Sequence, residues 1–232
     1  MPRPQVEPGF PSRLVDGYKA FYYGRLRHER ERFERLAATG QKPEVMIVAC
    51  CDSRAAPEVV FDAAPGEIFV VRNVANLVPP YAPDGVHHGT SAALEFAVQA
   101  LKVRHIVVMG HGRCGGVHAF RASREEGAGE PLSPGDFIGK WMSLLEPATA
   151  DIRCEEPGSA AARQRALEEA SIRNSLANLM TFPCVRELVA TSRLRLHGAW
   201  FDIAAGQLWL MDPQTGDFAM AMAEADPRAA RP

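Results

Sequence analysis

Apolar and polar segments alternate along the chain in a way that predicts strands and helices in turn. The apolar runs at 45–50, 68–71 and 105–111 are short and rich in β-branched residues, which is typical of strands buried in a parallel sheet. Residues 90–103 instead place apolar side chains at helical spacing. Because short buried strands alternate with helices, the pattern predicts an α/β fold with a mostly parallel central sheet flanked by helices.

The two ends of the chain carry different patterns. Residues 13–39 put charged and aromatic side chains three and four positions apart, which predicts one solvent-facing helix that Gly40 ends. Residues 193–218 alternate apolar with polar positions around Ala205-Gly206, which predicts a hairpin or an antiparallel edge strand. The expected organisation is a single domain over 1–232, with a helical arm at about 13–40, an α/β core at about 44–215 and a flexible tail at 220–232.

Local signals predict several helix ends. Thr90 or Ser91 is expected to cap the helix that follows, and Pro57 to open a short helix. Residues 159–180 are rich in Ala, Glu and Arg, which favours a long helix. Pro183 should break or restart that helix.

Composition and charge narrow the classes of partner. The chain has 232 residues, 47% hydrophobic and 23% charged, as expected for one α/β domain. A net charge of −2 argues against nucleic-acid binding, which needs a clustered cationic surface. The sequence has neither the roughly 20 apolar residues that span a bilayer nor a secretory leader. We therefore expect a cytoplasmic protein that binds neither nucleic acid nor membranes.

The five cysteines are the first candidates for chemistry. An odd number without a leader favours reduced thiols, so each is either a metal ligand or an ordinary buried residue. Cys50 ends the first predicted strand, and His111-Gly112-Arg113-Cys114 follows the third. Neighbouring parallel strands would bring these groups to one edge of the sheet, where thiolates and an imidazole suit zinc. His-x-x-Cys by itself is a weak signal, since such a pair is more often part of a core or a turn.

The segment Cys50-Cys51-Asp52-Ser53-Arg54 strengthens the case for a site. It carries three ionisable residue types within five positions as the chain leaves an apolar strand. Asp52 and Arg54 are two residues apart and suit a charge-assisted pair. A surface salt bridge in a loop is the alternative interpretation.

Together these segments resemble the signature of the β-class carbonic anhydrases, Cys-x-Asp-x-Arg followed by His-x-x-Cys. The similarity extends over roughly Tyr18 to Trp209. Three further positions resemble the plant-like, type I-like branch of that family, namely Gln41, Ile47 and Ala49. Gln41 lies nine residues before Cys50.

The resemblance implies a zinc enzyme that reversibly hydrates carbon dioxide to bicarbonate and a proton. Zinc would be held by Cys50, His111 and Cys114, and zinc-bound hydroxide would attack carbon dioxide. Asp52 would orient that hydroxide while Arg54 keeps the carboxylate away from the metal. In a closed form of the site, Asp52 would itself become the fourth zinc ligand.

The resemblance also implies substrate-binding residues and a partner. Gln41 would donate its amide to substrate, commonly across a dimer interface, and Phe69 would form an apolar wall of the carbon dioxide pocket. Gly115, directly after Cys114, is also expected to bind substrate. A plain loop residue is the alternative for Gln41, and core packing is the alternative for Phe69. The chain would form a homodimer or a dimer-based oligomer, with its N-terminal helix packed on the partner.

Two other functions fit the same residues. One is hydrolysis of carbon disulfide or carbonyl sulfide at the same metal, as some relatives with this fold perform. The other is a non-catalytic, zinc-stabilised binding protein. The Asp52–Arg54 pair argues against this last alternative, because a closed structural zinc does not need neighbouring groups arranged for water.

Overall fold

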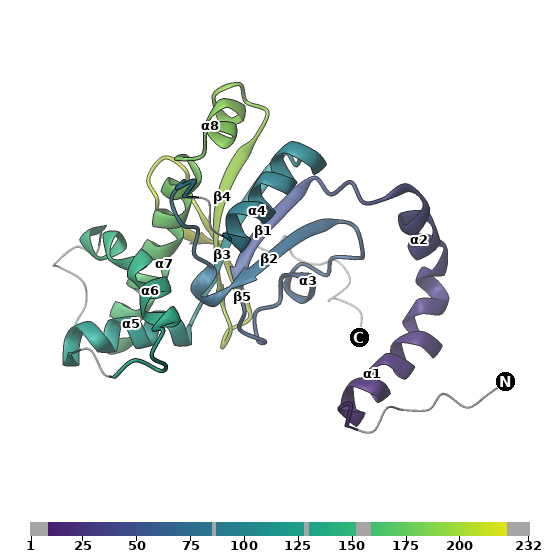
Figure 1. The fold of residues 1–232 in the computed structure, drawn as a ribbon, viewed down its shortest axis with the longest axis horizontal. Helices are drawn as coiled ribbons and strands as arrows, with labels where there is room; N and C mark the ends of the chain where they lie inside the picture. Colours follow the sequence, from purple (N-terminus) through teal and green to yellow (C-terminus); the bar gives the residue numbers. More distant parts are fainter. Residues whose placement is uncertain (1–8, 85–86, 128–129, 152–158, 222–232) are drawn as a thin grey trace, which may run out of the picture. The chain divides into compact units, whose positions relative to one another are not determined.

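The computed structural model describes residues 9–84, 87–127, 130–151 and 159–221 (Figure 1). The chain forms two compact units, Met1–Gln41 and Lys42–Pro232. From residue 222 onward, the expected tail lies outside the described residues.

The first unit consists of two helices where the sequence pattern predicts one, and that prediction is wrong. Helix α1 (Ser12–Tyr23) ends at Gly24, and α2 (Arg25–Thr39) begins directly after it. Gly24 has φ −106° and ψ −98°, and a Cβ atom there would lie 2.7 Å from the carbonyl oxygen of Ala20, so the break requires glycine. Within the described residues, neither helix has a buried side chain.

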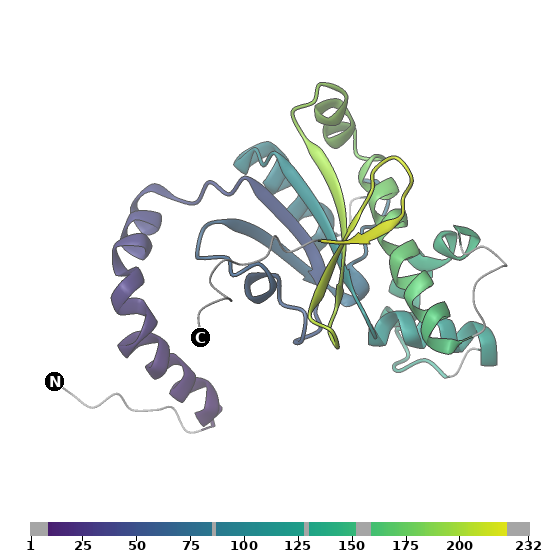
Figure 2. The same ribbon diagram turned by 180° about the vertical axis from the view of Figure 1, so that it is seen from behind.

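The second unit is built on a sheet with the order β2-β1-β3-β4-β5-β6 (Figures 1 and 2). The first four strands in that order are parallel, whereas β5 is antiparallel to β4, and β6 is antiparallel to β5. The strands are β1 (Val45–Cys50), β2 (Ile68–Asn73), β3 (His105–His111), β4 (Arg195–Asp202), β5 (Gln207–Met211) and β6 (Phe218–Met220). The predicted mostly parallel sheet with antiparallel C-terminal strands is confirmed, and β6 extends the predicted hairpin.

Helices cover the two faces of this sheet unequally. On one face, α4 (Gly89–Glu95), α7 (Ala160–Leu179) and α8 (Pro183–Ala190) bury an apolar cluster against β1 and β3 (Figure 1). On the other face, α3 (Pro57–Val60) packs Val60 against a smaller apolar cluster. The other helical segments are η1 (Val74–Asn76), η2 (Phe96–Leu101), α5 (Gly115–Glu126), α6 (Phe137–Met142), η3 (Ser143–Leu145) and η4 (Pro147–Asp151).

Both proline signals are confirmed, but the predicted cap is wrong. Pro57 and Pro183 open α3 and α8. Helix α4 begins at Gly89 with His88 as its N-cap. The Thr90 hydroxyl instead accepts a hydrogen bond from Asn73 Nδ2 at 3.2 Å, which ties the start of α4 to the end of β2. None of the helices in the described ranges is long and apolar enough to cross a membrane.

Candidate metal centre

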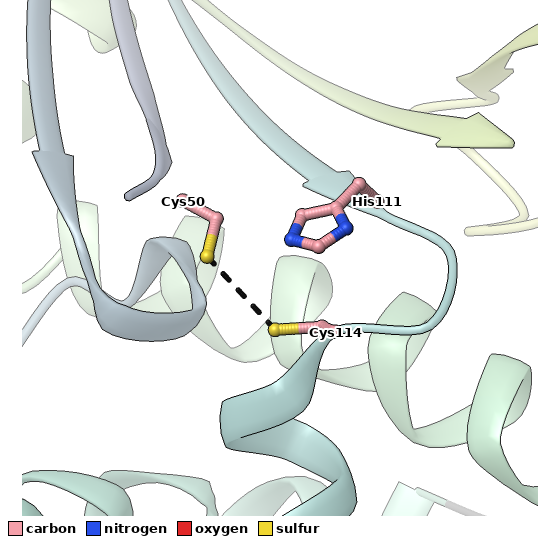
Figure 3. A group of neighbouring side chains, drawn as sticks. All are labelled: Cys50, His111 and Cys114. Carbon is pink, nitrogen blue, oxygen red and sulfur yellow. Dashed lines mark hydrogen bonds between the residues drawn. The ribbon is translucent and has the colours of Figure 1, made fainter. Parts of the chain in front are cut away.

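Two neighbouring strands and one helix converge at the carboxyl edge of the parallel sheet. Strands β1 and β3 pair in register, so that Cys50 and His111 end them side by side. The chain then turns back through Arg113, whose φ of 59° is left-handed, and Cys114 becomes the N-cap of α5. One ligand atom from each of Cys50, His111 and Cys114 lies within 4.8 Å of the others (Figure 3).

These three donors fit a tetrahedral cation. The Sγ atoms of Cys50 and Cys114 are 4.0 Å apart. Two zinc–sulfur bonds of about 2.3 Å at a tetrahedral angle require about 3.8 Å. His111 Nδ1 donates to the Gly112 carbonyl oxygen at 3.0 Å, which leaves the lone pair on Nε2. That Nε2 atom is buried and has no hydrogen-bond partner among the described residues, a costly arrangement that a cation would relieve.

The pKa values of the two thiols are shifted in opposite directions, which favours a thiolate at Cys50. The hydrogen bond with Cys114 lowers the pKa of Cys50 to about 4, against the opposing effect of burial. The same bond, followed by burial, raises the pKa of Cys114. The backbone N–H of Ala75 also donates to Cys50 Sγ at 3.4 Å. The opposite shifts mean that one proton is held between the two thiols, and a divalent cation bound by both sulfurs would displace it.

Asp52 and Arg54 form the predicted pair beside these donors. Arg54 Nε donates to Asp52 Oδ1 at 2.9 Å, and Arg54 Nη2 donates to Asp52 Oδ2 at 2.7 Å. Asp52 Oδ2 lies 3.9 Å from His111 Nε2, so the carboxylate borders the cluster. The hydrogen bonds from Arg54 hold the pKa of Asp52 well below its ordinary value. Arg54 Nη2 also donates to the Arg113 carbonyl oxygen at 3.3 Å, which links the two loops.

Arg72 fixes the backbone of the first loop, a role that the sequence pattern does not predict. Its Nε donates to the Cys50 carbonyl oxygen at 2.8 Å, and its Nη2 donates to the Asp52 carbonyl oxygen at 2.7 Å. The signal that points to it is an arginine directly after the apolar run 68–71 and still within β2. Asn73, the next residue, bonds both backbone groups of Leu77 and closes the turn after β2.

Helix α7 contributes a second group of residues that sequence reasoning misses. Glu168 is 1% exposed and accepts a hydrogen bond from the Cys114 backbone N–H at 2.9 Å. Its other partners are Gln164 Nε2 at 2.9 Å and Trp200 Nε1 at 3.1 Å. Burial raises the pKa of the Glu168 carboxyl above its ordinary value.

The three predicted substrate residues lie in different places. Gly115 follows Cys114, and a Cβ atom there would meet no described atom within 4 Å. Phe69 pairs in register with Met46, four residues before Cys50 on β1. At a rise of about 3.3 Å per residue, Phe69 is about 13 Å along the strands from the cluster in its own chain. Gln41 is the last residue of the first unit, and its predicted role stays a prediction.

The fold and the cluster define an α/β protein that gathers side chains able to hold a metal ion at the carboxyl ends of its parallel strands. The family model described as carbonic anhydrase matches residues 45–208. A carbonic anhydrase from Pseudomonas aeruginosa is 37% identical over 199 residues, covering 86% of each chain. The chain belongs to the carbonic anhydrase family.

Solved structures define the class within that family. The β-carbonic anhydrase CcaA is similar with a TM-score of 0.75 and 26% identity, covering 92% of each chain. A second similar structure is described as one of two tetrameric β-carbonic anhydrases from Sordaria macrospora. It has a TM-score of 0.74 and 27% identity, and the similarity covers 90% of this chain and 98% of that one. These similarities agree with the predicted β class.

Proposed function

We propose that this protein catalyses the zinc-dependent, reversible hydration of carbon dioxide to bicarbonate and a proton. The observation that carries the proposal is the buried set of two thiols and one imidazole nitrogen that has no hydrogen-bond partner in the part of the chain that the structure describes, with the Asp52–Arg54 pair at its border. Family membership supports the same reaction.

Zinc is the ion that this donor set favours, because two thiolates and an imidazole match its borderline-soft character. Cys50, His111 and Cys114 would hold it. When bound, zinc is a Lewis acid that acidifies water, although two thiolates neutralise its charge and make it weaker than a three-histidine zinc. We therefore expect carbon dioxide hydration to increase through mildly alkaline pH.

Asp52 and Arg54 orient the attacking water. Asp52 Oδ2, next to His111 Nε2, is the acceptor that would take a hydrogen bond from that water and fix its lone pair toward carbon dioxide. Arg54 restrains both carboxylate oxygens, a geometry that favours the form in which Asp52 stays off the metal. In the closed form, the Asp52 carboxylate would leave Arg54 and become the fourth ligand.

The remaining substrate contacts are part of the proposal. Gly115 is an exposed residue that begins α5, and backbone N–H groups at the start of a helix suit the oxygens of bicarbonate. Gln41 would donate its amide to substrate, and Phe69 would supply an apolar wall. Because Phe69 is remote from the cluster of its own chain, we propose that it serves the site of a partner copy, as we propose for Gln41.

A homodimer or dimer-based oligomer is consistent with the first unit. Its helix α1 exposes large apolar side chains, namely those of Leu14, Tyr18, Tyr22 and Tyr23. We propose that these side chains pack on a second copy in a cytoplasmic enzyme. Light scattering would test this: Tyr18→Glu should shift the protein toward monomer, and an unchanged mass would contradict the assignment.

The decisive test of the function is stopped-flow carbon dioxide hydration from pH 6.5 to 9, with zinc measured in the same sample. The expected result is about one zinc per chain and turnover that increases with pH. Carbonyl sulfide and carbon disulfide should be poorer substrates. Zinc-loaded protein that hydrolyses either of these while failing to hydrate carbon dioxide would contradict the proposal.

A further inference from the structure

Helix α7 holds the backbone of one metal-binding residue at both of its polar groups. The Cys114 N–H donates to Glu168 Oε1 at 2.9 Å, and the Cys114 carbonyl oxygen accepts from Gln164 Nε2 at 3.2 Å. Gln164 Nε2 also donates to Glu168 Oε1 at 2.9 Å, so the two side chains act as one unit. All three residues are at most 9% exposed. Water therefore contributes little to these contacts.

The Cys114 N–H needs such an acceptor. Cys114 is the N-cap of α5, where backbone N–H groups have no partner within the helix. In the described residues its side chain makes no capping bond, because the thiol is directed to the cluster (Figure 3). A buried N–H left without an acceptor is costly, because it loses its hydrogen bond to water and gains none in the protein. The Glu168 carboxylate removes that penalty and fixes the direction of the Cys114 backbone.

The other oxygen of Glu168 is fixed by a rigid indole. Trp200 Nε1 donates to Glu168 Oε2 at 3.1 Å. The Arg165 guanidinium lies 4.4 Å from the centre of the Trp200 ring and 4.3 Å from the centre of the Trp209 ring. Trp200 also packs on the turn itself, since a Cβ atom at Gly112 would lie 3.0 Å from Trp200 Cζ2. Glu168 is thus held through both of its carboxylate oxygens.

We propose that Glu168 is a positioning residue for the metal: it sets the backbone of Cys114 so that the thiol reaches the cation. The inference rests on the proposed zinc site. Loss of a group that orients a metal ligand typically weakens metal affinity or activity by about 10- to 100-fold. If Glu168 only completed the packing of α7, its loss would lower stability and leave zinc affinity unchanged.

Glu169 provides a matched control on the same helix. Its Oε1 accepts from Arg165 Nε at 2.8 Å, and no contact with Cys114 is described for it. Glu169→Gln removes one acidic charge next to position 168 and leaves the contacts of Cys114 in place. Glu168→Leu removes the acceptor at similar volume. Glu168→Gln keeps one oxygen for the Cys114 N–H but presents an amide N–H₂ group to Trp200.

The experiment measures zinc dissociation constants by competition with a chromophoric chelator, and cobalt–thiolate absorption after loading with Co²⁺. Glu169→Gln should match wild type. Glu168→Leu should bind zinc about 10- to 100-fold more weakly and show altered cobalt bands. Glu168→Gln, which conserves volume, should be weaker by about tenfold and carries the test if the leucine variant does not fold.

The outcomes separate this inference from the proposed function. A folded Glu168→Leu or Glu168→Gln protein with the zinc affinity and cobalt spectrum of Glu169→Gln would overturn the positioning role alone. Wild-type protein that takes up neither zinc nor cobalt at Cys50, His111 and Cys114 would overturn both.

Discussion

The two ends of strand β3 both gather ionisable side chains, with opposite results. At the carboxyl end, His111 is 1% exposed and its Nε2 has no partner among the described residues, next to the thiols of Cys50 and Cys114. At the amino end, His105 Nδ1 lies 3.0 Å from His197 Nε2 on β4, so these two imidazoles satisfy each other. Strand pairing alone therefore brings such groups together, whereas a metal site also needs burial and unsatisfied donors.

The surroundings of the two ends explain this difference. Around the carboxyl end, Arg72 fixes the loop after β1, and Glu168 fixes the turn after β3. At the amino end, burial lowers the pKa of His197, followed by the charges of His105 and Arg195. Among the described residues, the donors that lie close enough together to hold a metal ion are at the carboxyl end of β3 and not at this end.

Removing a donor at the carboxyl end should have the largest effect. His111→Ala or Cys114→Ser leaves an incomplete set of donors, so zinc content should decrease from about one per chain to less than about one tenth. His105→Asn, at the other end of the same strand, should keep zinc at the wild-type level. Metal analysis after dialysis measures both. Full zinc retention in Cys114→Ser would contradict the assignment of ligands.

Asp52→Asn should separate metal binding from catalysis. The amide preserves the size of the side chain but replaces the charged carboxylate that would accept a hydrogen bond from the attacking water. We expect kcat/KM for carbon dioxide to decrease by about 100-fold or more while zinc content stays unchanged. Stopped-flow assays and zinc analysis on one preparation measure both quantities, and undiminished hydration would exclude the role assigned to Asp52.

The start of α5 offers a matched pair of glycines. A Cβ atom at Gly116 would lie 2.8 Å from Val74 Cγ1, whereas at Gly115 it would meet no described atom within 4 Å. Gly116→Ala should lower the free energy of unfolding by about 1–3 kcal/mol through overpacking. Gly115→Ala should change it by less than about 0.5 kcal/mol. Urea unfolding measures both values, and equal losses would refute the close packing of this turn.

The smallest effect is expected at the amino end. Because the pKa of His197 is lower in the folded than in the unfolded chain, protons bind the unfolded chain more readily. The contribution of His197 to stability is therefore present above the unfolded pKa of about 6.5 and is lost as pH falls through the folded pKa. His197→Asn should reduce the difference in unfolding free energy between pH 7.5 and 5.5. An unchanged difference would contradict the lowered pKa of His197 in the folded chain.

Much of this architecture can be predicted from sequence because its signals are local. The strands β1 and β3 are predicted from their apolar runs. The polar segments that follow these runs predict which strand ends carry possible metal ligands. The break at Gly24 is not predictable in this way, because one glycine is tolerated in a helix and the close contact with Ala20 appears only in three dimensions. Thr90 is a typical capping residue whose hydroxyl is used by Asn73 instead.

Glu168 shows why the rest of the site escapes sequence reasoning. It lies 54 residues after Cys114 in a helix rich in Glu, Ala and Arg, next to the ordinary ion-paired Glu169. The available signal is the position of Glu168 around the helix axis, since it lies on the buried face of α7 together with Ile172 and Leu179. A charged residue on an apolar stripe marks a buried carboxylate that needs donors, but helical spacing does not identify those donors.

X-ray absorption at the zinc edge of the loaded protein tests the central claim most directly. Coordination by Cys50, His111 and Cys114 predicts two sulfur atoms at about 2.3 Å and one imidazole nitrogen at about 2.0–2.1 Å, with a light atom completing the shell. A shell of nitrogen and oxygen alone, or one with a single sulfur, would contradict it.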